Sequence, residues 1–112
     1  MNRFLLFAAM LITSAALHAA GTPLAVPTDA NAKYTVLEVG GKHPHRTIVT
    51  KRVGSSGTSF AKREYNCSTG TVRYLGDGDT LAEMARSKPS PNMAPIVPRS
   101  IADYVGHRAC AR

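Results

Sequence analysis

Residues 46–66 read RTIVTKRV-GSSG-TSFAKREYN, and this stretch decides the fold. Its first part, 46–53, is rich in β-branched residues, which favour strands. The glycine-bounded segment 54–57 is a turn signal, and 58–66 returns as a second strand. The stretch therefore predicts an antiparallel β-hairpin.

Two further strands are predicted on either side of this hairpin. Residues 34–39 (YTVLEV) precede it and are stopped by Gly40 and Gly41. Residues 71–75 (TVRYL) follow it after a short turn. Consecutive strands joined by short turns pair as neighbours, which predicts an antiparallel meander of four strands.

The C-terminal third is predicted to be helical, with an extended segment in the middle. Thr80 and Glu83 form a capping box that opens a short helix ending near Ser87. Segment 88–98 contains four prolines, which exclude a helix or a central strand. A last helix begins at Ser100. The expected fold is α+β, with the short helices on one face of the sheet.

Cys67 and Cys110 are the two cysteines of the chain. An even number of cysteines in a small exported protein indicates a disulfide, and neither residue belongs to a C-x-x-C motif. We expect the Cys67–Cys110 bridge to link the C-terminal helix to the sheet.

The N-terminus has the layout of a bacterial secretory signal. Arg3 is followed by an apolar run from Phe4 to Leu17 and then by small residues. A membrane-spanning helix needs about 20 apolar residues, so the run is short for a permanent anchor. We expect a signal peptide over 1–20, a flexible leader over 21–32, and one α+β domain over 33–112. The mature protein would then reside in the periplasm or on the surface of a Gram-negative bacterium, with no transmembrane span.

The charge is strongly basic. The 112 residues contain 14 Lys and Arg against 7 Asp and Glu, for a net charge of +7. This size and composition argue against a multidomain enzyme, a polytopic membrane protein and an acidic disordered tail. Outside the cytoplasm the charge favours envelope or host polyanions over nucleic acid, and the alternative is that a basic surface only keeps a small protein soluble.

A basic cluster is the candidate binding site. One interpretation is a concentrated surface for an anionic glycan, a lipid or an acidic partner. The other is a solvated edge strand whose lysines prevent aggregation. The cluster comprises Lys42, Arg46, Lys51, Arg52, Lys62 and Arg63.

Two other motifs have weaker interpretations. His43 and His45 could bind a metal ion or a haem, but a metal site needs three or four ligands and the flanking Lys42 and Arg46 would repel a cation, so an exposed polar turn is the preferred interpretation. Asp77 and Asp79 alternate with glycine as in calcium loops, yet Asp79 also precedes a helix, where negative charge is favourable. No nucleophile stands beside a base, so we expect no enzyme activity and no cofactor.

Residues 58–110 resemble the surface-adhesin protein E family of small exported bacterial proteins. The resemblance lies in Tyr65-Asn66-Cys67, in Val72 to Leu75, and in Ile96 to Ile101 continuing to Cys110. It implies a strand that carries Y-x-C, a following strand, a proline-bounded loop and a helix that ends at the partner cysteine. It also implies a periplasmic or surface location, and the adhesin that names the family binds host matrix components.

The leading hypothesis is an exported, non-enzymatic binding module that recognises a protein or a polyanion. The alternative is a periplasmic accessory of a conjugation or type IV secretion apparatus, in which small basic exported proteins also occur.

Overall fold

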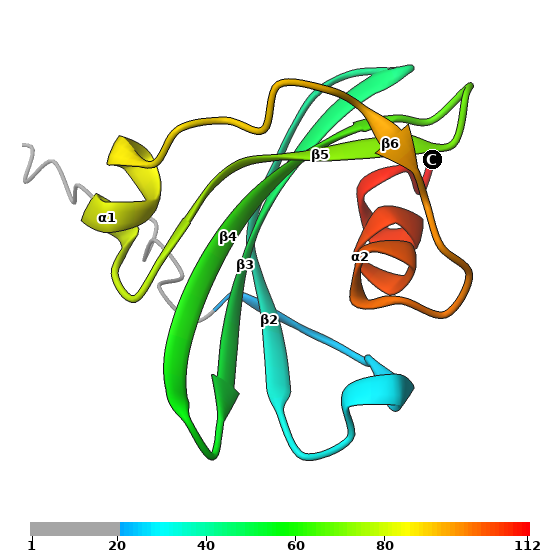
Figure 1. Cartoon of the computed structure of the whole chain (residues 1–112). Coiled ribbons are helices and arrows are strands. Elements are labelled where there is room, and N and C mark those ends of the chain that lie inside the picture. The colour runs from blue at the N-terminus through cyan, green and yellow to red at the C-terminus, as the bar shows by residue number, and fades with distance from the viewer. Residues whose placement is uncertain (1–20) are drawn as a thin grey trace, which may run out of the picture.

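The computed structural model describes residues 21–112, which form a six-stranded antiparallel sheet with two α-helices (Figure 1). The strands follow one another in chain order across the sheet, from β1 to β6. Their bounds are β1 Thr22–Leu24, β2 Lys33–Lys42, β3 His45–Gly54, β4 Gly57–Asn66, β5 Thr71–Gly78 and β6 Ala94–Pro95. The helices are α1 Leu81–Arg86 and α2 Ile101–Ala109, and a 3-10 turn, η1, spans Pro27–Asp29. The predicted α+β meander is confirmed in its four central strands.

The sheet has six strands, not the four expected. The additional strands β1 and β6 are three and two residues long, and each contains a proline. Proline is tolerated at a sheet edge because an edge strand leaves some of its N–H groups unpaired. Strands this short show no alternation in the sequence, so the pattern could not reveal them.

The predicted leader, residues 21–32, is part of the folded domain. It holds β1, which pairs with β2, and η1. Val26 within it is only 7% exposed. The domain of the described chain therefore starts before Lys33. The two prolines that suggested a flexible leader belong to an edge strand and to a 3-10 turn.

The two helices pack on opposite faces of the sheet, not on one face as expected. A Cβ added at Gly76 of β5 would lie 2.2 Å from the carbonyl oxygen of Met84 in α1. A Cβ added at Gly106 of α2 would lie 2.6 Å from the ring of Tyr65 in β4. The pairing register places Gly76 and Tyr65 on opposite faces, and Figure 1 shows α2 in the hollow of the curved sheet with α1 outside it. We call these the concave face, which packs on α2, and the convex face, which packs on α1.

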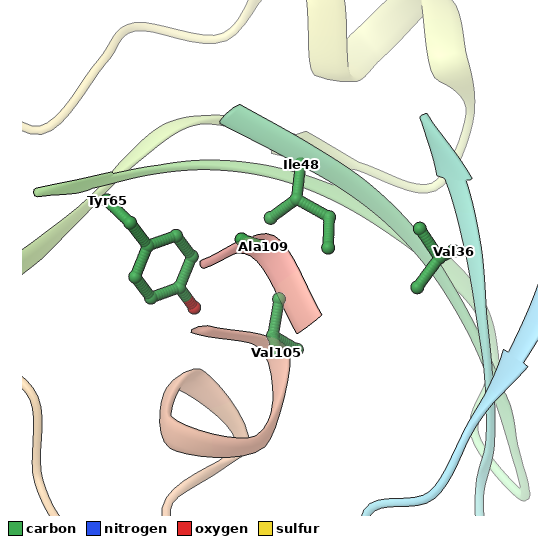
Figure 2. Packing of buried hydrophobic residues seen from close by; sticks show 5 residues of the cluster. All are labelled: Val36, Ile48, Tyr65, Val105 and Ala109. Carbon is green, nitrogen blue, oxygen red and sulfur yellow. The ribbon is translucent and has the colours of Figure 1, made fainter. Parts of the chain in front are cut away.

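The hydrophobic core lies between the concave face and α2 (Figure 2). Tyr65 is fully buried, and its hydroxyl donates to the carbonyl oxygen of Ala102 at 2.6 Å. Burial raises the pKa of this hydroxyl, which keeps it protonated as the donor. The buried cluster consists of Val36, Ile48, Tyr65, Val105 and Ala109.

The predicted disulfide between Cys67 and Cys110 is confirmed. Cys67 directly follows β4, and Cys110 is the C-cap of α2. Their Cα atoms lie 5.7 Å apart, and 43 positions separate them in the sequence. The bridge therefore fixes the end of the helix to the end of a central strand.

The predicted signal peptide, residues 1–20, lies outside the described residues. Within residues 21–112, no helix is long and apolar enough to cross a membrane. The proline-rich segment 88–98 contains β6 and no helix, as expected.

Candidate functional site

The six basic residues of the predicted cluster do not form one surface, because they divide by residue type between the two faces. Side chains of adjacent strand residues point to opposite faces. Arg46 pairs with Tyr65, so it shares the concave face. The same register puts all three arginines, Arg46, Arg52 and Arg63, on the concave face and all three lysines, Lys42, Lys51 and Lys62, on the convex face.

The edge-strand interpretation of the cluster is wrong. β3 and β4 carry most of its residues, and both are central strands of the sheet. Their backbone groups are paired on both sides, so their lysines are not needed to block pairing with another chain.

Arg46 supports the C-terminal end of α2. Its Nε donates to the carbonyl oxygen of Ala109 at 3.0 Å, and its Nη1 donates to that of Gly41 at 2.6 Å. The last carbonyls of a helix lack partners within the helix, and a cation there is favourable. The contacts of Arg46 are therefore structural.

Arg52 binds the turn that precedes β2. Its Nε lies 2.8 Å from Oδ2 of Asp29 and 3.2 Å from the hydroxyl of Tyr34. The hydrogen bond from Arg52 lowers the pKa of Asp29, and the bond from Tyr34 adds to this effect. This ion pair holds η1 against the sheet and neutralises the charge of Arg52.

Arg63 is buried without an acidic partner among residues 21–112. The residue is 5% exposed, and its Nη1 and Nη2 donate to the hydroxyls of Thr50 at 3.2 Å and Tyr74 at 3.1 Å. Its guanidinium carbon lies 4.9 Å from the centre of the Tyr74 ring, a cation–π distance. Its Nε has no hydrogen-bond acceptor in the described part of the chain. A buried cation that hydroxyls and a ring alone support is costly, which makes Arg63 the most unusual charge in the sheet.

The convex face presents a diagonal line of basic residues across four strands. Lys33 of β2 pairs with Val53, two positions along β3 from Lys51. Lys62 of β4 pairs with Val49, two positions from Lys51 in the other direction. The next diagonal neighbour, on β5, is Arg73, which pairs with Glu64. We call Lys33, Lys51, Lys62 and Arg73 the basic diagonal.

The basic diagonal is long enough for an extended ligand. Diagonal neighbours in an antiparallel sheet lie ~7–8 Å apart, so its three steps span roughly 21–24 Å. Sequence reasoning missed Lys33 and Arg73 because their membership depends on the register between strands. They could have been found from the alternation of side chains along each strand, once the pairing shows which alternate residues point to the convex face.

The three lysines of the basic diagonal carry uncompensated charge. None of them forms an ion pair with any carboxylate in residues 21–112, whereas Arg73 binds Glu64 at 3.2 Å. Glu38 of β2, opposite Val49 in the register, is a second acidic residue on the convex face beside Glu64 of β4. Lys42 lies on the same face at the far end of β2, away from the diagonal.

The two weaker motifs have structural roles or no assigned role. No group of three or more potential ligands (His, Cys, Asp or Glu) that could hold a metal occurs in the described chain, the surroundings of His43 and His45 included. The N-cap half of the predicted capping box is confirmed, because the Thr80 hydroxyl accepts from the backbone N–H of Glu83 at 3.1 Å. Glu83 in turn accepts from the backbone N–H of Asp79 at 2.9 Å.

The segment that resembles the surface-adhesin protein E family contains the core tyrosine, Tyr65, and both cysteines of the disulfide. Comparison of the chain with family models, curated proteins and solved structures found no match. The resemblance stays a prediction from the residues.

Proposed function

We propose that the protein is an exported, non-enzymatic binding module of the bacterial envelope, and that it recognises a polyanion through the basic diagonal. The observation that carries the proposal is the alignment of Lys33, Lys51, Lys62 and Arg73 on one face of the sheet. The signal-like N-terminus and the disulfide support a location in the periplasm or on the cell surface.

The arrangement favours a linear polyanion over a folded protein partner. A row of like charges at similar spacing suits a polymer that repeats its own negative charges. The lysines have flexible stems and strongly hydrated ammonium groups, which bind as point charges and tolerate varied geometry. Envelope glycans, lipopolysaccharide and host glycosaminoglycans have this chemistry in common.

The packing beneath the diagonal explains how the lysines are presented. Val49 lies between Lys62 and Glu38 in the register and is 5% exposed although it is on the convex face. Aliphatic stems of long charged side chains cover apolar surface while the charged ends reach solvent. The lysine stems can therefore cover the apolar surface of this face while the ammonium groups stay in solvent.

The test compares two variants that lose the same charge. The first carries Lys33→Gln, Lys51→Gln and Lys62→Gln. The control carries Arg99→Gln, Arg108→Gln and Arg112→Gln, which are exposed and lie outside the diagonal. Both lose three positive charges, so a difference between them reports position, not net charge.

The measurement is the salt concentration that elutes each protein from immobilised heparin. We expect the diagonal variant to elute well before the control, because binding of a polyanion to a row of cations releases condensed counterions. Equal elution of the two variants would show that net charge alone governs retention, and the basic diagonal would be rejected as a site. N-terminal sequencing of protein recovered from the periplasm checks the export step.

A further inference from the structure

A cavity of about 240 Å³ opens on the concave face, on the opposite side of the sheet from the basic diagonal. Residues of β2 to β5 line it, together with Ile101 at the start of α2. Pockets for drug-sized ligands are about 300–1,000 Å³, so this cavity suits a smaller molecule. The polar residues that matter here are Thr50, Arg52, Arg63, Tyr74, Asp77 and Asp79.

The cavity has a cation in its wall that the described chain leaves without a counter-charge. Arg63 is 5% exposed, and its hydrogen bonds and cation–π contact among residues 21–112 are with the hydroxyls of Thr50 and Tyr74 and with the Tyr74 ring. A guanidinium has five N–H donors in a planar fork that matches a carboxylate. Two of these donors are used in the hydrogen bonds given above, which leaves one further N–H on each of Nη1 and Nη2, while Nε is itself buried and has no acceptor among residues 21–112. Arg63 is therefore prepared for an anionic group that the domain does not supply.

The charges around Arg63 restrict which kind of ligand can carry the anionic group. Arg52 is already paired with Asp29. Asp77 is a diagonal neighbour of Arg63 in the register, yet its carboxylate accepts from the hydroxyl of Ser87 at 3.3 Å and forms no ion pair with Arg63 in the described chain. Asp79 also lines the cavity. A ligand with several negative charges would meet these two aspartates, and they would repel it.

We propose that this cavity binds a small zwitterion of the α-amino acid class. The ligand's carboxylate is held by Arg63, and its ammonium group faces Asp77 and Asp79. The apolar residues Ala61 and Ile101 also line the cavity and contact the ligand's side chain. The site is separate from the basic diagonal, so either proposal can fail while the other stands.

The experiment is a titration of the isotope-labelled protein, residues 21–112 with the disulfide intact, followed by NMR. Each of the twenty common L-amino acids is added up to about 10 mM, a range that detects dissociation constants in the millimolar range and below, which correspond to binding free energies of a few kcal/mol. The Nε–H signal of Arg63 and the backbone signals of β4 and β5 are monitored. We expect at least one amino acid to shift these signals to saturation. If no amino acid moves the Arg63 signal, the proposal is wrong.

The best binder is then compared with two analogues, one without the amine and one without the carboxylate. For L-leucine these are 4-methylpentanoate and 3-methylbutylamine. Each analogue should bind about tenfold more weakly or worse, because it leaves a charged group of the site without its partner. Equal affinity of either analogue would contradict the zwitterion.

Variants locate the site in the cavity. Ala61→Leu adds bulk to the cavity wall on the concave face and should abolish the shifts. Asp77→Asn combined with Asp79→Asn keeps the shape of the exposed rim and should weaken amino acid binding severalfold while sparing the analogue without an amine. The control Arg108→Gln, exposed on α2, should bind like the parent chain.

Arg63→Gln gives the most direct variant, although it changes a buried residue. If it remains folded by circular dichroism, its affinity should fall at least about tenfold. If it unfolds, Ala61→Leu and the aspartate pair decide the question. Undiminished binding by a folded Ala61→Leu variant would overturn the proposal.

Discussion

Replacement of Gly106 by alanine should destabilise the protein, although alanine is the better helix former. Gly106 lies in α2 against Tyr65, and an alanine Cβ there would lie 2.6 Å from Cε1 of the ring and 3.1 Å from Cδ1. Both distances are shorter than ordinary van der Waals contacts. Either the ring or the helix has to move.

The structure shows why neither can move cheaply. Tyr65 is fully buried, and its hydroxyl is held by the carbonyl of Ala102, one turn earlier in α2. The disulfide at Cys110 and the bond from Arg46 to Ala109 hold the end of the same helix. Movement of the ring would therefore strain several contacts at once.

The competing magnitudes determine the direction of the change. A Gly-to-Ala change in a helix interior stabilises by about 1 kcal/mol. Overpacking of a filled core costs ~1–3 kcal/mol, and a weakened buried hydrogen bond adds ~0.5–1.5 kcal/mol. We expect a net loss of about 0.5–3.5 kcal/mol from the free energy of unfolding.

Urea denaturation of the disulfide-intact protein measures this loss. His107→Ala is the matched control in the same helix, because the His107 side chain is 80% exposed and its change should stay within about 0.5 kcal/mol. In a Tyr65→Leu background the cost of Gly106→Ala should shrink, since the ring edge is absent. A Gly106→Ala protein as stable as the parent would refute the argument that the ring is fixed.

Two further predictions concern the cross-links of the fold. Replacement of both Cys67 and Cys110 by alanine should lower the free energy of unfolding by about 4 kcal/mol on the chain-entropy model, given the 43 positions between them; a change below 1 kcal/mol in urea denaturation would contradict a major structural role. Asp29→Asn should remove an acid-dependent part of the stability: Arg52 lowers the pKa of Asp29 below 3.8, so the folded protein binds fewer protons than the unfolded chain, and the advantage of the parent over the variant should be complete above about pH 4 and disappear as the pH falls through the lowered pKa. Parallel pH–stability curves for parent and variant would show that the ion pair contributes nothing.

The local sequence pattern was sufficient to predict the elements that depend on residues close together in the sequence. The β-branched runs on both sides of 54–57 predicted the hairpin because alternation and turn chemistry act within a few residues. The capping box at Thr80 was predictable for the same reason. The edge strands β1 and β6 were not, because so few residues carry no period and their pairing depends on what lies beside them.

The candidate sites depended on information that lies between strands. The sequence showed Lys51-Arg52 and Lys62-Arg63 as adjacent pairs, and alternation alone implied that each pair would split. It could not show that the lysines would share one face and the arginines the other, since this depends on the register of β3 against β4. A shift of one residue would exchange the two faces.

The sequence by itself therefore determined the type of each long element, the disulfide partners and the basic character of the protein, because these follow from composition and local order. Only the tertiary structure decided which charges are satisfied and which remain available. Lys33 and Arg73 join Lys51 and Lys62 through strand pairing. Arg63 is enclosed between two hydroxyls and a tyrosine ring that come from β3 and β5. Distances across the sheet set the electrostatics of both sites, and the chain establishes those distances only when it folds.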